Sequence, residues 1–310
     1  MLNKIIIIGG GLSGLSAAHT AIEHGVNVIL LEKSSFCGGN SSKATSGLNG
    51  CVTKTQIKNG INDSIEAYEK DTILSSTLGK EYKPYQLAKI LTENSSSSIE
   101  WLTSKFKIDL SVISRLGGHS FPRTHRGKDR FPGMNITYAL LEKLEEIEKN
   151  SNGEKAKIIN SANANKLIKD DNENVIGVEY SNLKDKKTYK EFGIIVICTG
   201  GFSADFTNED SLIKEYRPDL INFSTTNGSY STGDGMKICR NIGAELIDME
   251  NVQIHPTGFI QPSDPGNKVK FLAAEALRGA GGIILNSNGE RICDELGRRD
   301  YVSNEMLKNK

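Results

Sequence analysis

The chain has 310 residues, with 38 lysines and arginines against 38 aspartates and glutamates, and 37% of its residues are hydrophobic. A formal charge of zero excludes a general binder of nucleic acid or anionic membranes, which needs a basic excess. The hydrophobic content is too high for a disordered chain and suffices for one large domain or two modest ones. Glycine supplies 31 of the 310 residues, and this surplus favours a backbone that must approach a phosphate-rich ligand closely.

The five cysteines are widely scattered and form no Cys-x-x-Cys pair; they are Cys37, Cys51, Cys198, Cys239 and Cys293. We expect reduced, buried thiols, no metal site and a cytoplasmic protein. The apolar run Ile5–Ile8 is too short for a targeting peptide, and no longer apolar run suggests a membrane span. Neither a membrane nor a nucleic acid is therefore predicted as a partner.

The N-terminal segment predicts a strand, a helix and a second strand. The isoleucines of Ile5–Ile8 are typical of a parallel strand buried on both faces. A helix is expected over Leu12–Glu23 with Gly25 at its end, followed by a strand over Val26–Leu31. Glu32 stands at the end of that strand, so the segment reads as a βαβ unit.

The rest of the chain predicts loops, helices and short strands. In chain order these are a loop at 38–60, helices at 61–74, 85–106 and 138–148, a β-meander with strands around Ile158, Leu167 and Val178, a buried strand at 193–198, and a short helix introduced by 232–236. A change of motifs near Asp248 predicts two domains, residues 1–247 and 248–310.

A glycine motif lies between the first strand and the first helix. Gly9 allows a tight turn, Gly11 lets the backbone approach a pyrophosphate, and Gly14 lets the helix pack on the strand. Glu32, 18 residues beyond Gly14, can accept hydrogen bonds from ribose hydroxyls. The helix N-terminus, at Leu12 and Ser13, offers amide groups to the phosphates. This context predicts a dinucleotide site.

Two further glycine segments favour FAD over NAD. Gly38 and Gly39 follow Glu32 closely and open a polar loop rich in backbone amides. The strand at 193–198 ends in Thr199, Gly200 and Gly201, after the predicted β-meander. Two approaches to one cofactor, about 160 residues apart, suit a flavin dinucleotide.

Five segments resemble a known family, and they occur in the family's order. They are GGNSSKATSGLN at 38–49, GGHSFPRTH at 117–125, QIHPT at 253–257, AEALRG at 274–279 and ELGRRD at 295–300. The chain resembles the soluble fumarate reductase flavoproteins, which are related to succinate dehydrogenase flavoprotein and L-aspartate oxidase. The resemblance implies an α/β fold, with a Rossmann-like FAD-binding domain that carries a β-meander and a partial α+β capping domain.

The resemblance also implies which residues contact FAD. They are Gly9, Gly11, Leu12, Ser13, Gly14, Glu32, Lys33, Gly38, Gly39, Asn40, Ser41, Thr45, Ser46, Gly47, Thr199, Gly200 and Asp234. Membrane-complex relatives attach FAD covalently through a histidine. Asn40 stands at the matching position, which implies non-covalent FAD.

Fumarate is a small planar dianion, so its pocket needs cationic donors around two carboxylates. His255, Arg278 and Arg299 are of the right type. The resemblance implies that His255 binds a substrate carboxylate, that Arg299 delivers a proton, and that Glu275 and Arg278 pass protons to it. The residues alone leave two plainer interpretations open, a core histidine for His255 and a surface ion pair for Glu275 and Arg278. Ala274 stands where many relatives have threonine.

Two interpretations remain for the basic residues at 115–130, a solvated face or an electropositive approach for the substrate. Arg298 is expected to be solvated or paired with Glu295.

The family continues beyond the segment that matches Lys310, so a truncated chain is expected. We therefore carry forward two hypotheses. The first is the N-terminal part of an enzyme that reduces fumarate to succinate and is active only when completed, either by a C-terminal polypeptide or as the full-length gene product. Its electron donor would be reduced flavin, a nicotinamide or a protein. The second is a truncated FAD-binding protein without turnover. A narrower option is a relative that acts on another dicarboxylate, like L-aspartate oxidase or succinate dehydrogenase.

Overall fold

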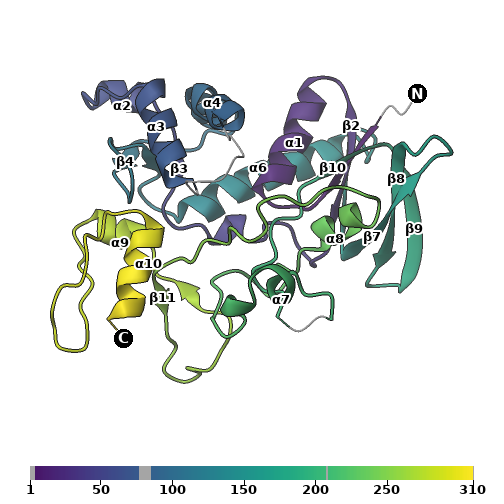
Figure 1. Ribbon diagram of the computed structural model, residues 1–310. Coiled ribbons are helices and arrows are strands. Elements are labelled where there is room, and N and C mark those ends of the chain that lie inside the picture. The colour runs from purple at the N-terminus through teal and green to yellow at the C-terminus, as the bar shows by residue number, and fades with distance from the viewer. Residues whose placement is uncertain (1–3, 77–84, 207–208, 310) are drawn as a thin grey trace. The chain divides into compact units, whose positions relative to one another are not determined.

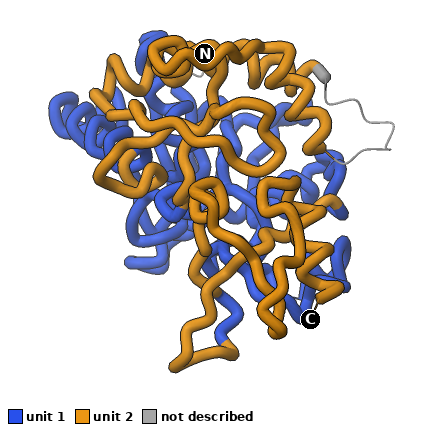
Figure 2. Tube along the Cα trace, turned by 90° about the vertical axis from the view of Figure 1, so that its left-hand side faces the viewer, with its two compact units in different colours: residues 1–43, 136–250, 267–269 blue, residues 44–135, 251–266, 270–310 orange. Residues whose placement is uncertain are grey.

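The structure, a computed structural model, describes residues 4–76, 85–206 and 209–309. Its contacts divide the chain into two compact units, coloured separately in Figure 2. Unit 1 comprises residues 1–43, 136–250 and 267–269, and unit 2 comprises residues 44–135, 251–266 and 270–310. This division differs from the two predicted domains, 1–247 and 248–310, because residues 44–135 group with the C-terminal segments.

Unit 1 is built on a four-stranded parallel sheet (Figure 1). Its strand order is β10 (Ile194–Ile197), β1 (Lys4–Ile8), β2 (Asn27–Glu32) and β6 (Ala156–Asn160). Helix α1 (Leu12–Glu23) follows β1, so the predicted βαβ unit is confirmed. Ile6, Ile7 and Leu30 are completely buried, as expected for central strands of a parallel sheet.

The β-meander consists of β7 (Ala162–Lys169), β8 (Val175–Asn182) and β9 (Lys187–Phe192). The prediction was wrong about its first strand, because the segment around Ile158 is β6 and pairs with β2 in the parallel sheet. The third strand, β9, is largely exposed and polar, so it carried no apolar signal in the sequence.

The strand β10 was correctly predicted, but its burial was not. Ile194 is 54% exposed and Ile197 is 37% exposed. The strand lies at the edge of the sheet, with β1 as its one neighbour in that sheet. The apolar run therefore predicted that a strand forms, but it did not reveal that this strand lies at the edge of the sheet.

Helical segments complete unit 1. They are α6 (Pro132–Asn150, whose first residues belong to unit 2), α7 (Leu212–Tyr216), α8 (Asp234–Arg240) and the 3₁₀ turns Ser41–Lys43 and Pro218–Leu220. Leu140 and Leu144 of α6 are completely buried. A ring nitrogen of the buried His19 on α1 lies 2.8 Å from the carbonyl oxygen of Leu140, which ties these two helices together.

Unit 2 combines small antiparallel sheets with helices. Its elements are β3 (Leu48–Asn49), α2 (Lys54–Lys58), α3 (Ile65–Ser75), α4 (Tyr85–Glu93), α5 (Ser95–Lys105), β4 (Val112–Ser114), β5 (Thr124–Arg126), β11 (Gly258–Phe259), β12 (Phe271–Leu272), α9 (Glu275–Gly279) and α10 (Arg299–Lys308). The sheets have the orders β3-β5-β4 and β11-β12. The α/β class of the chain is confirmed.

Two local predictions in unit 2 were wrong. Residues 54–58, expected in a loop, form α2, because Thr53 and Gln56 make a reciprocal capping box. The single helix expected over 85–106 is interrupted at Asn94, whose carbonyl oxygen accepts from the hydroxyls of two serines of α5. In the described part of the chain, every helix is too short or too polar to cross a lipid bilayer.

Candidate functional site

The turn between β1 and α1 has a backbone that tolerates only glycine at key points. Gly9 has φ +110°, and a Cβ there would overlap the carbonyl oxygen of Cys198. A Cβ on Gly14 would overlap the carbonyl oxygen of Gly9, so the helix packs directly on the turn. Gly11 is the N-cap of α1 and has no side-chain cap. The Leu12 amide donates to the Ser41 hydroxyl at 3.0 Å, so the amides that follow Leu12 in the first turn are the ones open to a ligand.

Glu32 is held rigidly at the carboxyl end of β2. One carboxylate oxygen accepts from the Gly10 amide at 2.8 Å, and the other accepts from the Ser34 amide at 2.7 Å. Each carboxylate oxygen has a second lone pair. The side chain can therefore still accept hydrogen bonds from ribose hydroxyls.

Lys33 anchors the segment that precedes α8. Its ammonium group donates to the Tyr230 carbonyl at 2.9 Å, to the Thr232 hydroxyl at 2.9 Å and to the Asp234 carboxylate at 2.6 Å. Two predicted cofactor residues, Lys33 and Asp234, are thus bonded to each other. Their role in the structure is to fix residues 230–234 beside the glycine turn.

Asn40 makes a second connection to the same segment. Its amide nitrogen donates to the Ser231 hydroxyl at 2.7 Å, and its oxygen accepts from the Gly228 amide at 2.8 Å. A carboxamide has no nucleophilic nitrogen, which supports the expectation of non-covalent FAD.

These elements surround a cavity of about 550 Å³ within unit 1, which we call the dinucleotide cavity. The predicted residues that line it are Gly9, Gly11, Leu12, Ser13, Glu32, Lys33, Gly39, Asn40, Ser41, Thr199, Gly200 and Asp234. Gly14 and Gly38 are not among the lining residues, and Thr45, Ser46 and Gly47 belong to unit 2. These five residues remain predictions as cofactor contacts.

The sequence analysis missed a second group of lining residues. It comprises Ala162, Asn163 and Ala164 at the start of β7, with Tyr230, Met236 and Leu246. None of them lies in a glycine motif, so only their proximity in the fold reveals them. The glycine turn, the open helix N-terminus and the anchored Glu32 fit FAD in chemistry.

A separate cluster of charged residues lies in unit 2, where α9 and α10 begin. Glu275 is 3% exposed and Arg278 is 5% exposed. One carboxylate oxygen of Glu275 accepts from Arg299 Nη2 at 2.7 Å and Nε at 3.1 Å, and lies 4.0 Å from Arg278 Nη2. The burial argues against an ordinary surface ion pair, because exposed pairs are solvated.

The pKa values in this cluster follow from burial and from the two arginines. Burial acts to raise the pKa of Glu275, but Arg299, Arg278 and the Gly117 amide together hold it below its ordinary value. Burial lowers the pKa of Arg278, and the neighbouring Arg299 lowers it further. Both effects keep Glu275 ionised and make Arg278 a better proton donor than a solvated arginine.

His255 joins this cluster from the segment before β11. Burial and the charge of Arg299 lower its pKa, so the ring is neutral near pH 7. Its Nδ1 lies 3.0 Å from the Thr257 carbonyl oxygen. Gln253, two residues earlier, accepts from Arg299 Nη1 at 3.0 Å. The structure thus brings together all four residues that were predicted to be catalytic.

Other predictions about charged residues were wrong or need refinement. Of the two alternatives for Arg298, the pair with Glu295 is wrong, because the Glu295 carboxylate bonds to Arg291 at 2.6 Å. The solvated alternative fits, because the Arg298 side chain is 41% exposed and bonds to the exposed Asp300. The basic stretch at 115–130 is neither a uniform solvated face nor a uniform approach, because Arg123 is completely buried. Among the residues that the structure describes, no group of three or more potential ligands could hold a metal ion.

Comparison with known proteins identifies the class of protein that carries these features. Residues 4–310 match the family described as FAD binding domain. The chain therefore belongs to this family, and FAD is its cofactor.

Within this class, the chain is similar to several fumarate reductases. It is 45% identical over 309 residues to a fumarate reductase of Schizosaccharomyces pombe, covering 99% of this chain and 59% of that protein. It is 41% identical to fumarate reductase 1 of Saccharomyces cerevisiae, covering 99% and 64% respectively. The open conformation of a flavocytochrome c3 fumarate reductase matches with a TM-score of 0.79 and 29% identity, over 99% of this chain and 51% of that one. The chain thus spans between half and two thirds of the length of these relatives.

Proposed function

We propose that this chain is the FAD-binding and partial substrate-binding portion of an enzyme that reduces fumarate to succinate. The observation that carries the proposal is the buried pair Glu275 and Arg278, bonded through Glu275 to the partly exposed Arg299 and lying beside His255, in a chain that also holds a dinucleotide cavity. The names of the S. pombe and S. cerevisiae relatives, both fumarate reductases, support fumarate as the substrate.

The cluster suits a dianionic substrate. The Nε and Nη2 atoms of Arg278 are buried and have no hydrogen-bond partner, and unpaired buried donors are costly unless a ligand satisfies them. A carboxylate of fumarate would accept from such a guanidinium, and His255 would bind it as well. Arg299, whose side chain is 41% exposed, is the more accessible of the two arginines.

Reduction adds a hydride to one alkene carbon and a proton to the other. Reduced FAD supplies the hydride when it is bound. Arg299 delivers the proton, and its own proton is replaced through Glu275, which bonds directly to its guanidinium at 2.7 Å. Glu275 in turn exchanges protons with Arg278. The continuous contact from Arg299 to Glu275 is what makes an arginine acid chemically tolerable.

The test is fumarate-dependent oxidation of reduced methyl viologen, with succinate measured as product. The chain is assayed alone and together with a C-terminal polypeptide that supplies the remaining length of the relatives. We expect FAD binding in both cases and turnover in the completed protein. A completed, FAD-loaded protein that forms no succinate would refute the proposal.

A second candidate is an FAD-binding protein without turnover. FAD uptake without succinate formation under every condition would support it. Acceptance of L-aspartate or of succinate with an artificial electron acceptor would instead support a relative that acts on those dicarboxylates.

We further propose an external electron donor (reduced flavin, a nicotinamide or a protein) and a cytoplasmic location. The location is supported by the five cysteines, all of which are free thiols in the structure. Cell fractionation and a donor screen with the completed protein would test these two points.

A further inference from the structure

The loop between β4 and β5 makes direct contact with Glu275. The Gly117 amide donates to the second carboxylate oxygen of Glu275 at 2.9 Å. A Cβ on Gly117 would lie 2.9 Å from that oxygen and 2.7 Å from the Gly297 carbonyl oxygen, so only glycine permits this approach. The Gly118 amide donates to the Leu296 carbonyl at 3.0 Å, and this hydrogen bond connects the loop to the segment before α10.

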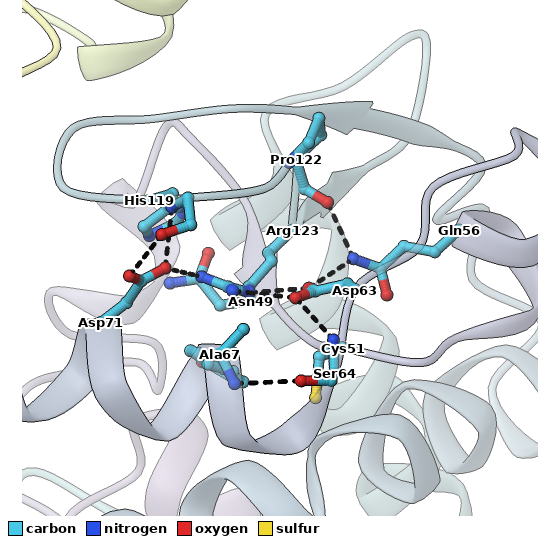
Figure 3. Close-up of polar contacts among 12 residues, drawn as sticks. Asn49, Cys51, Gln56, Asp63, Ser64, Ala67, Asp71, His119, Pro122 and Arg123 are labelled. Atoms are coloured by element: carbon cyan, nitrogen blue, oxygen red, sulfur yellow. Dashed lines mark hydrogen bonds and ion pairs between the residues drawn. The ribbon is translucent and has the colours of Figure 1, made fainter.

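Three residues further along, the same loop is fixed to α3. The Ser120 amide donates to Asp71 Oδ2 at 2.7 Å, and the Ser120 hydroxyl donates to Asp71 Oδ1 at 2.7 Å. Arg123 Nη1 donates to the same carboxylate. Asp71 is 7% exposed, so the attachment is buried and fully formed (Figure 3).

Arg123 locks the far end of the loop. Its Nε and Nη2 donate to the two oxygens of Asp63 at 2.7 and 2.9 Å, and its guanidinium lies 4.8 Å from the centre of the Tyr68 ring. Figure 3 shows Arg123 between the two aspartates. Because Arg123 is completely buried and bonds to two carboxylates, it restricts the movement of this end of the loop.

We propose that Asp71 is a positioning residue, which holds the loop so that the Gly117 amide stays bonded to Glu275. This inference rests on the proposed function, because it concerns the proton relay of the same cluster. Asp71 does not touch the cluster itself, and it acts through Ser120 and the short segment between Ser120 and Gly117. As a result, one carboxylate oxygen of Glu275 accepts from the Gly117 amide and the other accepts from Arg299.

The consequence for protonation follows from the groups that face Glu275. They are Arg299 on α10, Arg278 on α9, the Gly117 amide, and the rings of His119 and His255. Loss of the hydrogen bond from the Gly117 amide leaves the buried Glu275 carboxylate with one hydrogen-bond donor fewer. Its affinity for a proton then rises about tenfold, as is typical when one charge-assisted hydrogen bond is removed.

The experiment measures this protonation directly, without turnover. The chain is labelled with glutamate carrying ¹³C at the side-chain carboxyl, and the Glu275 resonance is assigned by its loss in Glu275→Gln. Asp71→Ala is expected to raise the pKa of Glu275. Ser64→Ala is the matched control, because it removes the N-cap of the same helix, a bond of 3.1 Å to the Ala67 amide, and leaves the loop attached.

An Asp71→Ala titration curve that coincides with that of the wild type would overturn the proposal. An equal rise in Ser64→Ala would do the same, since it would show that any destabilisation of α3 suffices. If Asp71→Ala does not fold, Ser120→Ala removes one of the two Ser120 bonds and is expected to shift the curve less, in the same direction; no shift there counts against the proposal. The readout needs no fumarate reduction, so failure of the proposed function would be recognised separately.

Discussion

Replacement of Glu275 by glutamine separates the chemistry of the cluster from its contribution to stability. The carboxylate accepts three hydrogen bonds, two from Arg299 and one from the Gly117 amide. An amide of the same shape has one accepting oxygen and one donating nitrogen, so in either orientation its nitrogen faces another donor. We expect a loss of about 1.5–3 kcal/mol of unfolding free energy, the value of a hydrogen bond to a charged group.

Turnover is expected to fall much further, by about 10²–10⁴-fold, because Glu275 can no longer pass a proton to Arg299. The assays are urea unfolding and fumarate-dependent oxidation of reduced methyl viologen by the completed protein. Glu295→Gln is the matched control. Glu295 is equally buried, at 3% exposed, and bonds to Arg291 and to the Ile284 amide rather than to Arg299.

The control is expected to lose stability and to retain its turnover number, because Arg278 contacts only the backbone carbonyl of Glu295. The reasoning would be refuted if Glu275→Gln turned over like the wild type. It would also be refuted if Glu295→Gln lost as much activity, since the effect would then come from general loosening of the segment.

Three further predictions concern the dinucleotide cavity and acid stability. Gly14→Ala places a Cβ against the Gly9 carbonyl oxygen, and we expect the protein to lose FAD on desalting, as measured by flavin absorbance. Lys33→Met removes the 2.6 Å ion pair with Asp234 and frees residues 230–234; the dissociation constant for FAD is expected to rise about tenfold, measured by flavin fluorescence. The hydrogen bond from Arg291 lowers the pKa of Glu295 from 4.5 to about 2, so its stabilising effect is complete above pH 4.5 and disappears as the pH falls towards 2. The difference in urea midpoint between the wild type and Glu295→Gln should accordingly be smaller at about pH 3 than at about pH 7.

Each of these three predictions has a control variant or a result that would contradict it. Gly266→Ala introduces a Cβ into open space and should retain FAD, and retention of FAD by Gly14→Ala would contradict the packing argument. Lys169→Met breaks a comparable ion pair with Glu173 and should not affect FAD. A urea-midpoint difference that is the same at both pH values would show that Glu295 is not ionised as we describe.

The sequence predicted the elements that local patterns define. Ile5–Ile8, the glycine turn and the strand before Glu32 follow from runs and spacings that need no knowledge of the rest of the fold. The Glu275 and Arg278 pair was predicted from a motif, and α9 places the two side chains 4.0 Å apart.

Features that depend on distant partners could not be predicted. Arg123 belonged to a basic stretch that was expected to be either a solvated face or an electropositive approach, but it is buried, and its partners Asp63 and Asp71 precede it by 60 and 52 residues. The cavity residues Tyr230 and Leu246 carry no motif. Tyr230 lines the site because Lys33 and Asn40 hold the segment at 228–234 in place. The segment around Ile158 was assigned to the meander because an apolar strand does not reveal which sheet it joins.

The path of the chain has a practical consequence. It leaves one unit for the other after residues 43, 135, 250, 266 and 269, so neither unit is a continuous stretch of polypeptide. A single cut cannot release an intact half, and a gene fragment that encodes either unit alone would need several splices. Each unit folds only when segments that are distant in the sequence come together. We therefore expect slow folding in which the two units form together. A protease that nicks any one loop is therefore expected to leave a molecule whose pieces remain associated until denaturant is added.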